Sequence, residues 1–194
     1  MSQEELKTQT HKPQAHKPQA HKPQAHKPQA KDIKDGVDTI VSQWLAAGVT
    51  DDLQPMEVFG RLARIHKHIE TEILRCHGEF GLRQGEFDVL ATLRRSGEPY
   101  TLTPGQLHQS MMLTSGAMTS RLDKLEQKGL ICRSHCTEDR RAVNVQLTAE
   151  GKAKVEAALP AHMAAQQQLL KGISVKDRQK LAALLKGWLG ELES

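Results

Sequence analysis

Aromatic side chains are scarce in this 194-residue chain, at 3% of the residues, and cysteine occurs only three times. So few aromatic groups leave little material for the stacking platforms with which proteins grip single-stranded nucleic acid. The three cysteines are an odd number, widely spaced, with no secretory apolar segment before them, so a cytoplasmic protein with reduced thiols is expected. No apolar run approaches the ~18 residues of a membrane span, and no membrane partner is expected.

Net positive charge is also lacking in the part of the chain that has the composition of a folded domain. The chain carries +4 overall. Residues 1–34, with seven lysines and three acidic side chains, account for all of it. Residues 35–194 hold 20 basic and 20 acidic side chains, which cancel. Any interaction with nucleic acid must therefore depend on local clusters of charge.

A repeat occupies the beginning of the chain, where His-Lys-Pro-Gln-Ala occurs four times over residues 11–30. Proline at every fifth position prevents a stable helix, and the unit has nothing with which to build a core. We therefore expect a disordered tail over residues 1–32 and one domain over residues 33–194. Three hypotheses for the tail remain open: no dedicated role, weak metal capture by its imidazoles, and loose electrostatic attraction to DNA.

Helical periodicity dominates the rest of the chain. Helices are predicted over residues 35–47, 55–79, 83–96, from Thr103, over 114–128, over 148–171 and from Ser174. Two short strands, 130–136 and 142–148, enclose a charged turn. The predicted fold is α+β and mostly α, with a helix-turn-helix at about 103–128 and a wing at about 130–148. The terminal helices have more apolar surface than a small domain needs, and we expect them to form a homodimer.

The helix over 114–128 has an apolar stripe and, in its N-terminal half, an outward face of small polar side chains. Such a face fits a DNA major groove, where short hydroxyl groups hydrogen-bond base edges or phosphates. The contacts expected from it are Thr114, Ser115, Gly116, Thr119, Ser120 and Lys124. An ordinary amphipathic surface helix has the same pattern, and the wing that follows distinguishes the two.

The charged turn of the wing carries Asp139, Arg140 and Arg141. Asp139 is close enough in sequence to hold the Arg141 guanidinium extended, and an extended arginine at a hairpin tip suits the narrow, electronegative minor groove. Arg140 is expected to contact a phosphate. The alternative for Asp139 and Arg141 is a solvated surface ion pair.

Residues 139–151, DRRAVNVQLTAEG, fit the pattern D-x-R-x-x-x-L-x-L-T-x-x-G, with Val145 in place of the first leucine. This pattern resembles the wing of MarR-family transcription regulators. The resemblance implies a winged-helix repressor that binds a pseudo-palindromic operator in double-stranded DNA as a homodimer. It also implies that Arg141 enters the minor groove and that Asp139 steadies it. No cofactor, metal or enzymatic activity is expected.

A second resemblance covers residues 37–151, where EFDVLATLRRSGEPYTLTPGQL and TSRLDKLEQKGL are similar to the PecS-type branch of that family. Members of this branch respond to urate and related purines. The resemblance implies four ligand-binding positions, at Trp44, Asp88, Arg121 and Arg133. Periodicity places Arg121 beside the apolar stripe of its helix, pointing into the domain, whereas Asp88 lies off the stripe of its own helix as an exposed acid unless another element covers it.

Several alternatives remain open. Trp44 also fits a plain core position, and Arg133 fits a contact to a DNA phosphate. His66 lies on an apolar stripe, either as a satisfied core or interface histidine or stacked on its twin across a dimer axis, as in some members of the branch.

The expected function is a transcriptional repressor released by a small aromatic anion such as urate. A regulator that answers to phenolic compounds or oxidants is the alternative within the family, and a non-specific architectural DNA protein is the alternative suggested by the basic tail. An enzyme requires a nucleophile with a base, or a full metal set, and neither occurs at a recognisable spacing.

Overall fold

The computed structural model describes residues 33–111, 118–135 and 143–194, and the chain divides between Asp51 and Asp52 into two compact units. Within its described residues, the first unit contains the helix α1 (Gly36–Ala46). The Asp35 carboxylate caps this helix by accepting a hydrogen bond of 2.7 Å from the backbone N–H of Val37. Gly48, with a φ of +87°, follows its end, where a glycine commonly stops a helix.

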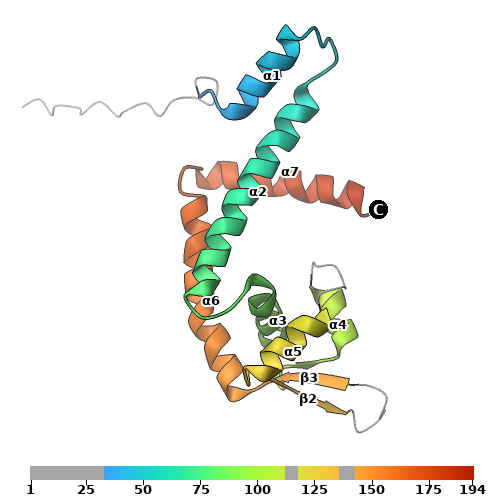
Figure 1. Cartoon of the computed structure of the whole chain (residues 1–194), viewed down its shortest axis with the longest axis vertical. Coiled ribbons are helices and arrows are strands. Elements are labelled where there is room, and N and C mark those ends of the chain that lie inside the picture. Colours follow the sequence, from blue (N-terminus) through green and yellow to red (C-terminus); the bar gives the residue numbers. More distant parts are fainter. Residues whose placement is uncertain (1–32, 112–117, 136–142) are drawn as a thin grey trace, which may run out of the picture. The chain divides into compact units, whose positions relative to one another are not determined.

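The second unit contains the other helices and the sheet (Figure 1). Its elements are α2 (Gln54–Gly78), α3 (Gln84–Arg95), β1 (Thr101–Leu102), α4 (Pro104–Ser110), α5 (Met118–Gln127), β2 (Ile131–His135), β3 (Val143–Leu147), α6 (Ala149–Leu169) and α7 (Val175–Leu192). The strands form one antiparallel sheet in the order β1-β3-β2. The predicted mostly helical α+β fold with a winged helix-turn-helix is therefore confirmed. The two-residue strand β1 was not predicted, because it is too short to show a period.

Helices α4 and α5 form the helix-turn-helix pair. Thr103 caps α4 as predicted: its hydroxyl accepts from the backbone N–H of Gln106 at 3.2 Å, and the Gln106 side chain accepts from the Thr103 N–H at 2.8 Å. Pro104 occupies the first turn of the helix, where its missing N–H has no cost. Local sequence signals therefore suffice to start this helix.

One hydrophobic core holds α5 against the neighbouring helices and the sheet. It joins α3, α4, α5, the sheet and the first half of α6, and its fully buried side chains include Leu90, Leu93, Leu107, Leu125 and Val145. Truncation of a buried leucine to alanine typically costs about 2–5 kcal/mol. Because exposure of the apolar side chains of α5 would be this costly, the core fixes which face of α5 points to solvent.

The long helices α2 and α6 pack against each other, and α6 continues through Pro160 to Leu169. The helix α7 has no buried side chain in the single chain. Its exposed large apolar residues are Val175, Leu181, Leu184, Leu185, Leu189 and Leu192. Apolar surface on this scale favours a partner, so the homodimer stays a prediction with a physical basis.

Candidate functional site

Helix α5 has a buried face and an exposed face. Met118, Leu122 and Leu125 are buried in the core. The predicted DNA contacts Thr119, Ser120 and Lys124 are exposed. The other predicted contacts of this helix, Thr114, Ser115 and Gly116, lie outside the described residues. Thr119 and Ser120, in the N-terminal half of the exposed face, are small and polar, which suits entry into a major groove.

Strands β2 and β3 form the predicted hairpin behind α5, with Arg133 opposite Val145 in antiparallel register. The tip residues Asp139, Arg140 and Arg141 lie outside the described residues, so their contacts to DNA stay predictions.

Close packing explains why the last position of the wing pattern, Gly151, is a glycine. A Cβ atom at this position would lie 1.8 Å from the carbonyl oxygen of Leu130, a backbone atom at the start of the wing. Thr148 fixes the same junction, since its hydroxyl donates to the Gly129 carbonyl at 2.7 Å and accepts from the Gly151 N–H at 3.0 Å. The wing and α6 can therefore approach this closely only with glycine at position 151.

Arg133 is held by acidic residues of α5. Its guanidinium lies 2.7 Å from an Asp123 carboxylate oxygen and 3.6 Å from a Glu126 oxygen, and its backbone N–H donates to Glu126 at 3.1 Å. Its side chain is about one quarter exposed, at 27%. These pairs join the first wing strand to α5 and leave Arg133 with its charge already balanced.

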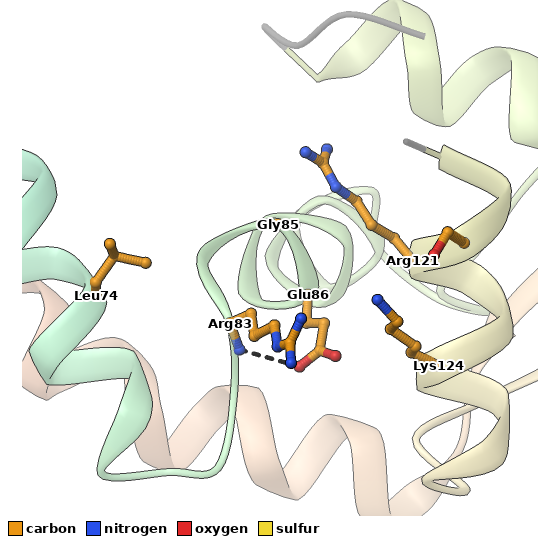
Figure 2. Close-up of a pocket in the computed structure, with 7 residues that line it drawn as sticks. Leu74, Arg83, Gly85, Glu86, Arg121 and Lys124 are labelled. Atoms are coloured by element: carbon orange, nitrogen blue, oxygen red, sulfur yellow. Dashed lines mark hydrogen bonds between the residues drawn. The ribbon is translucent and has the colours of Figure 1, made fainter. Parts of the chain in front are cut away.

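Arg121 extends from α5 across the first turn of α3, as Figure 2 shows. A Cβ atom at Gly85 would lie 2.4 Å from the Arg121 Nε atom and 2.7 Å from Cζ. The side chain is half-buried, which confirms that it points into the domain rather than outward. Glycine at position 85 thus makes room for the guanidinium.

Asp88 lies one turn further along α3 and is half-buried, so the alternative of a freely exposed acid is wrong. Burial raises the pKa of its carboxyl group to about 6, against the opposing attraction of Arg121 and Arg95. Arg95 in turn donates to the carbonyl of Ser110, the last residue of α4. Asp88 therefore interacts electrostatically with Arg121 of α5 and with Arg95, which holds the end of α4.

The structure brings together two of the four predicted ligand residues, Asp88 and Arg121. Arg133 is paired with the acidic residues of α5 instead. Trp44 lies in α1, which belongs to the separately described first unit. The positions of Trp44 and Arg133 in a ligand site therefore stay predictions.

Comparisons with known proteins identify the family. A model of the MarR family matches residues 82–143. PecS, an HTH-type transcriptional regulator of Dickeya dadantii, is 38% identical over 149 residues, which cover 77% of this chain and 90% of PecS. The chain belongs to the MarR family. Within the MarR family it is a regulator of the PecS type.

Two further relatives extend this finding. The transcriptional repressor YetL of Bacillus subtilis is 29% identical over 134 residues, 69% of this chain and 80% of YetL. The crystal structure of a mutant MarR from E. coli, complexed with operator DNA, matches with a TM-score of 0.63 and 26% identity, over 72% of this chain and 99% of that one. MarR-family proteins are transcription regulators, not enzymes.

A contact between a buried and a partly buried histidine is a feature of this MarR-family chain that the sequence did not indicate. His77 of α2 is completely buried, its Nε2 lies 3.1 Å from Nδ1 of His162 in α6, and its ring stacks on Phe87 at 4.0 Å between centroids. Burial and the neighbouring His162 lower the pKa of His77 to about 4. His66, which the sequence placed on an apolar stripe, is exposed in the single chain, so the alternative of a core histidine is wrong. Its place at a dimer interface stays a prediction.

Two features are absent from the described ranges. No group of three or more His, Cys, Asp or Glu side chains there is placed to hold a metal ion. None of the helices within those ranges combines the length and apolar character of a membrane span.

Proposed function

We propose that this chain is a transcriptional repressor that binds a pseudo-palindromic operator as a homodimer and leaves it when a small aromatic anion such as urate binds. One observation carries the DNA-binding part: α5 exposes small polar side chains while its opposite face is buried in the core. The helix can therefore enter a major groove without losing its anchorage. In a two-fold pair, two such helices reach successive major grooves ~34–36 Å apart, and the wings reach the flanking minor grooves.

The apolar surface of the long helices supports the homodimer. Beyond the leucines of α7, the exposed apolar side chains include Phe59, Ile65 and Ile69 of α2 and Met163 of α6. A two-fold pair covers the same surface on both protomers. The dimer in turn fixes the spacing of the two recognition helices, which a ligand can alter only if it binds the two spacings with different affinity.

Asp88 and Arg121 support the ligand-binding part. Arg121 offers a planar donor for an anionic oxygen, and Asp88 offers an acceptor for ring N–H groups. Both are half-buried, which strengthens hydrogen bonds to a ligand. Trp44 would supply a flat aromatic face, and Arg133 a second cation once it gives up part of its pairing with Asp123 and Glu126.

A response to phenolic compounds remains the second candidate, because they too are flat anions or hydrogen-bond donors. An oxidant response through Cys76 is less well supported. Burial raises the pKa of the Cys76 thiol, and a protonated thiol reacts slowly with oxidants.

The test is a gel-shift titration of operator-bound protein with urate, using wild type, Asp88→Asn and, as a matched control, Asp51→Asn. We expect urate to release wild type and the control, while Asp88→Asn stays bound at the same concentration. Charge-assisted hydrogen bonds contribute about 1.5–3 kcal/mol, so the midpoint for Asp88→Asn should rise roughly tenfold or more. If millimolar urate leaves the wild-type complex intact, urate is not the ligand. The gel shift without urate decides whether the protein binds the operator.

A further inference from the structure

A pocket of about 290 Å³ lies between the first turn of α3 and one flank of α5, with α2 across from it (Figure 2). Its lining side chains are Leu74, Arg83, Glu86, Ser120, Arg121 and Lys124. Arg121 and Lys124 extend from α5 toward α3, and Arg83 joins them from the N-terminal end of α3. Three cationic side chains from two elements therefore surround one cavity.

The one carboxylate among the described lining residues of this pocket, Glu86, is paired with a lysine that lies outside the lining. Glu86 is buried. One of its oxygens accepts from Lys128 Nζ at 2.7 Å and from the Arg83 backbone N–H at 3.0 Å. Burial opposes ionisation of Glu86, yet these hydrogen bonds and the nearby cations hold the pKa of its carboxyl group below its usual range. Lys128 and Arg83 both act on Glu86, and Arg121 also attracts Asp88, which lies outside the lining. Four cations thus face two carboxylates, and the pocket keeps a net positive charge.

We propose that this pocket binds a small molecule bearing a diphosphate or similar pair of adjacent oxyanions, and that this molecule competes with DNA for Lys124. Guanidinium groups present planar donors that match phosphate oxygens, and the lysine ammonium adds a compact charge. A diphosphate carries more than one negative charge and can engage more than one of these cations. Arg121 also belongs to the proposed urate site, so the two ligands would exclude each other. The Ser120 hydroxyl supplies a further hydrogen bond, and Leu74 offers an apolar contact for the rest of the molecule.

The competition follows from the position of Lys124. This proposal rests on the proposed operator binding, in which the exposed side chains of Ser120 and Lys124 face the DNA. A ligand that holds the Lys124 ammonium in the pocket removes one charge from the DNA contact, and each such charge contributes to the affinity. Release would then be direct, in addition to any change in dimer spacing.

Inorganic pyrophosphate is the probe, and binding is first measured without DNA. Isothermal titration calorimetry at constant ionic strength compares wild type, Arg83→Gln, Lys124→Gln and the control Lys186→Gln, which removes an exposed charge from α7. We expect saturable binding to wild type and control, tighter than that of monophosphate, and a dissociation constant roughly tenfold or more higher in the two pocket variants. No saturable binding to wild type, or binding that both pocket variants retain, would overturn the site.

The second measurement is operator affinity with and without pyrophosphate at the same ionic strength. Arg83 is not an expected DNA contact, so Arg83→Gln should bind the operator as wild type does and lose most of the weakening by pyrophosphate. If pyrophosphate binds wild type but leaves operator affinity unchanged, the competition is refuted. If wild type binds no operator at all, the proposed function fails, and calorimetry still decides on the pocket.

Discussion

At the scale of single residues, the fold holds His77 neutral. The buried ring lies between Phe87 and His162, and its Nδ1 atom has no hydrogen-bond partner within the described residues. Protonation would place a charge on a completely buried ring, which is costly without a compensating partner. The pKa of His77 is accordingly lowered to about 4, and burial also lowers the pKa of His162.

The low pKa of His77 predicts a loss of stability in mild acid. An unfolded histidine takes up a proton near pH 6.5, whereas His77 in the folded chain does so only near pH 4. The unfolded state therefore binds more protons in this window, and stability present above about pH 6.5 is lost as the pH falls toward 4. Urea unfolding at pH 7 and pH 5 should show a smaller loss for His77→Leu than for wild type. The exposed-site control His108→Gln should lose as much as wild type, and an equal loss in all three proteins would contradict the assignment.

Gly85 predicts a second effect at the scale of one residue. In Gly85→Ala the new methyl group meets the end of the Arg121 side chain, which is flexible and can move, so the fold should survive with α3 intact. The guanidinium then leaves its place near Asp88, and we expect weaker release of operator DNA by urate. Gly78→Ala, where a Cβ meets nothing within 4 Å, is the matched control. A Gly85→Ala protein with an unchanged urate midpoint would show that the position of Arg121 is unimportant.

At the scale of elements, the wing depends on its contact with α6. The Cβ of an alanine at position 151 would collide with the Leu130 backbone, which cannot move without shifting the start of β2. Overpacking of a tight site typically costs about 1–3 kcal/mol, and we expect Gly151→Ala to reach or exceed this range. Thermal unfolding should show a clear loss relative to wild type, while Gly187→Ala, which meets nothing within 4 Å, should not. Equal melting temperatures for the two variants would contradict the proposed close approach.

The elements themselves were largely predictable, and the contacts between them were not. Periodicity and caps located the long helices, and Thr103, Thr148 and Ser174 each accept the hydrogen bond that starts a helix. The offset of Arg121 from its apolar stripe correctly placed it against the domain. These signals are local, so one sequence is enough to reveal them.

Contacts between residues far apart in the chain could not be predicted from the sequence. Lys128 reaches Glu86 across 42 positions, and His77 reaches His162 across 85. The pairing of Arg133 with Asp123 was equally hidden, because the turn from α5 into β2 decides which way the strand presents its side chains. No spacing rule connects residues on different elements. The four ligand residues were therefore inferred from family resemblance, and the structure brings together only Asp88 and Arg121.

At the scale of the whole molecule, the apolar faces of the long helices predict a dimer. Leu185 of α7 is partly exposed in the single chain, amid other exposed leucines of that helix. An aspartate there would place a charge in the apolar contact, so Leu185→Asp should yield monomers or aggregates. Sedimentation velocity measures this directly, with Lys186→Gln as the control that should stay dimeric. A wild type that sediments as a stable monomer would overturn the dimer.

The central claim is that two recognition helices of one dimer bind a discrete operator and that a ligand near Asp88 and Arg121 releases it. Footprinting on genomic DNA fragments that the protein selects by binding, with and without urate, tests this most directly. We predict protection of one site with two half-sites about 10 bp apart, centre to centre, which urate abolishes for wild type and leaves in place for Asp88→Asn. Uniform protection along the fragment, with no discrete site at any protein concentration, would contradict the account.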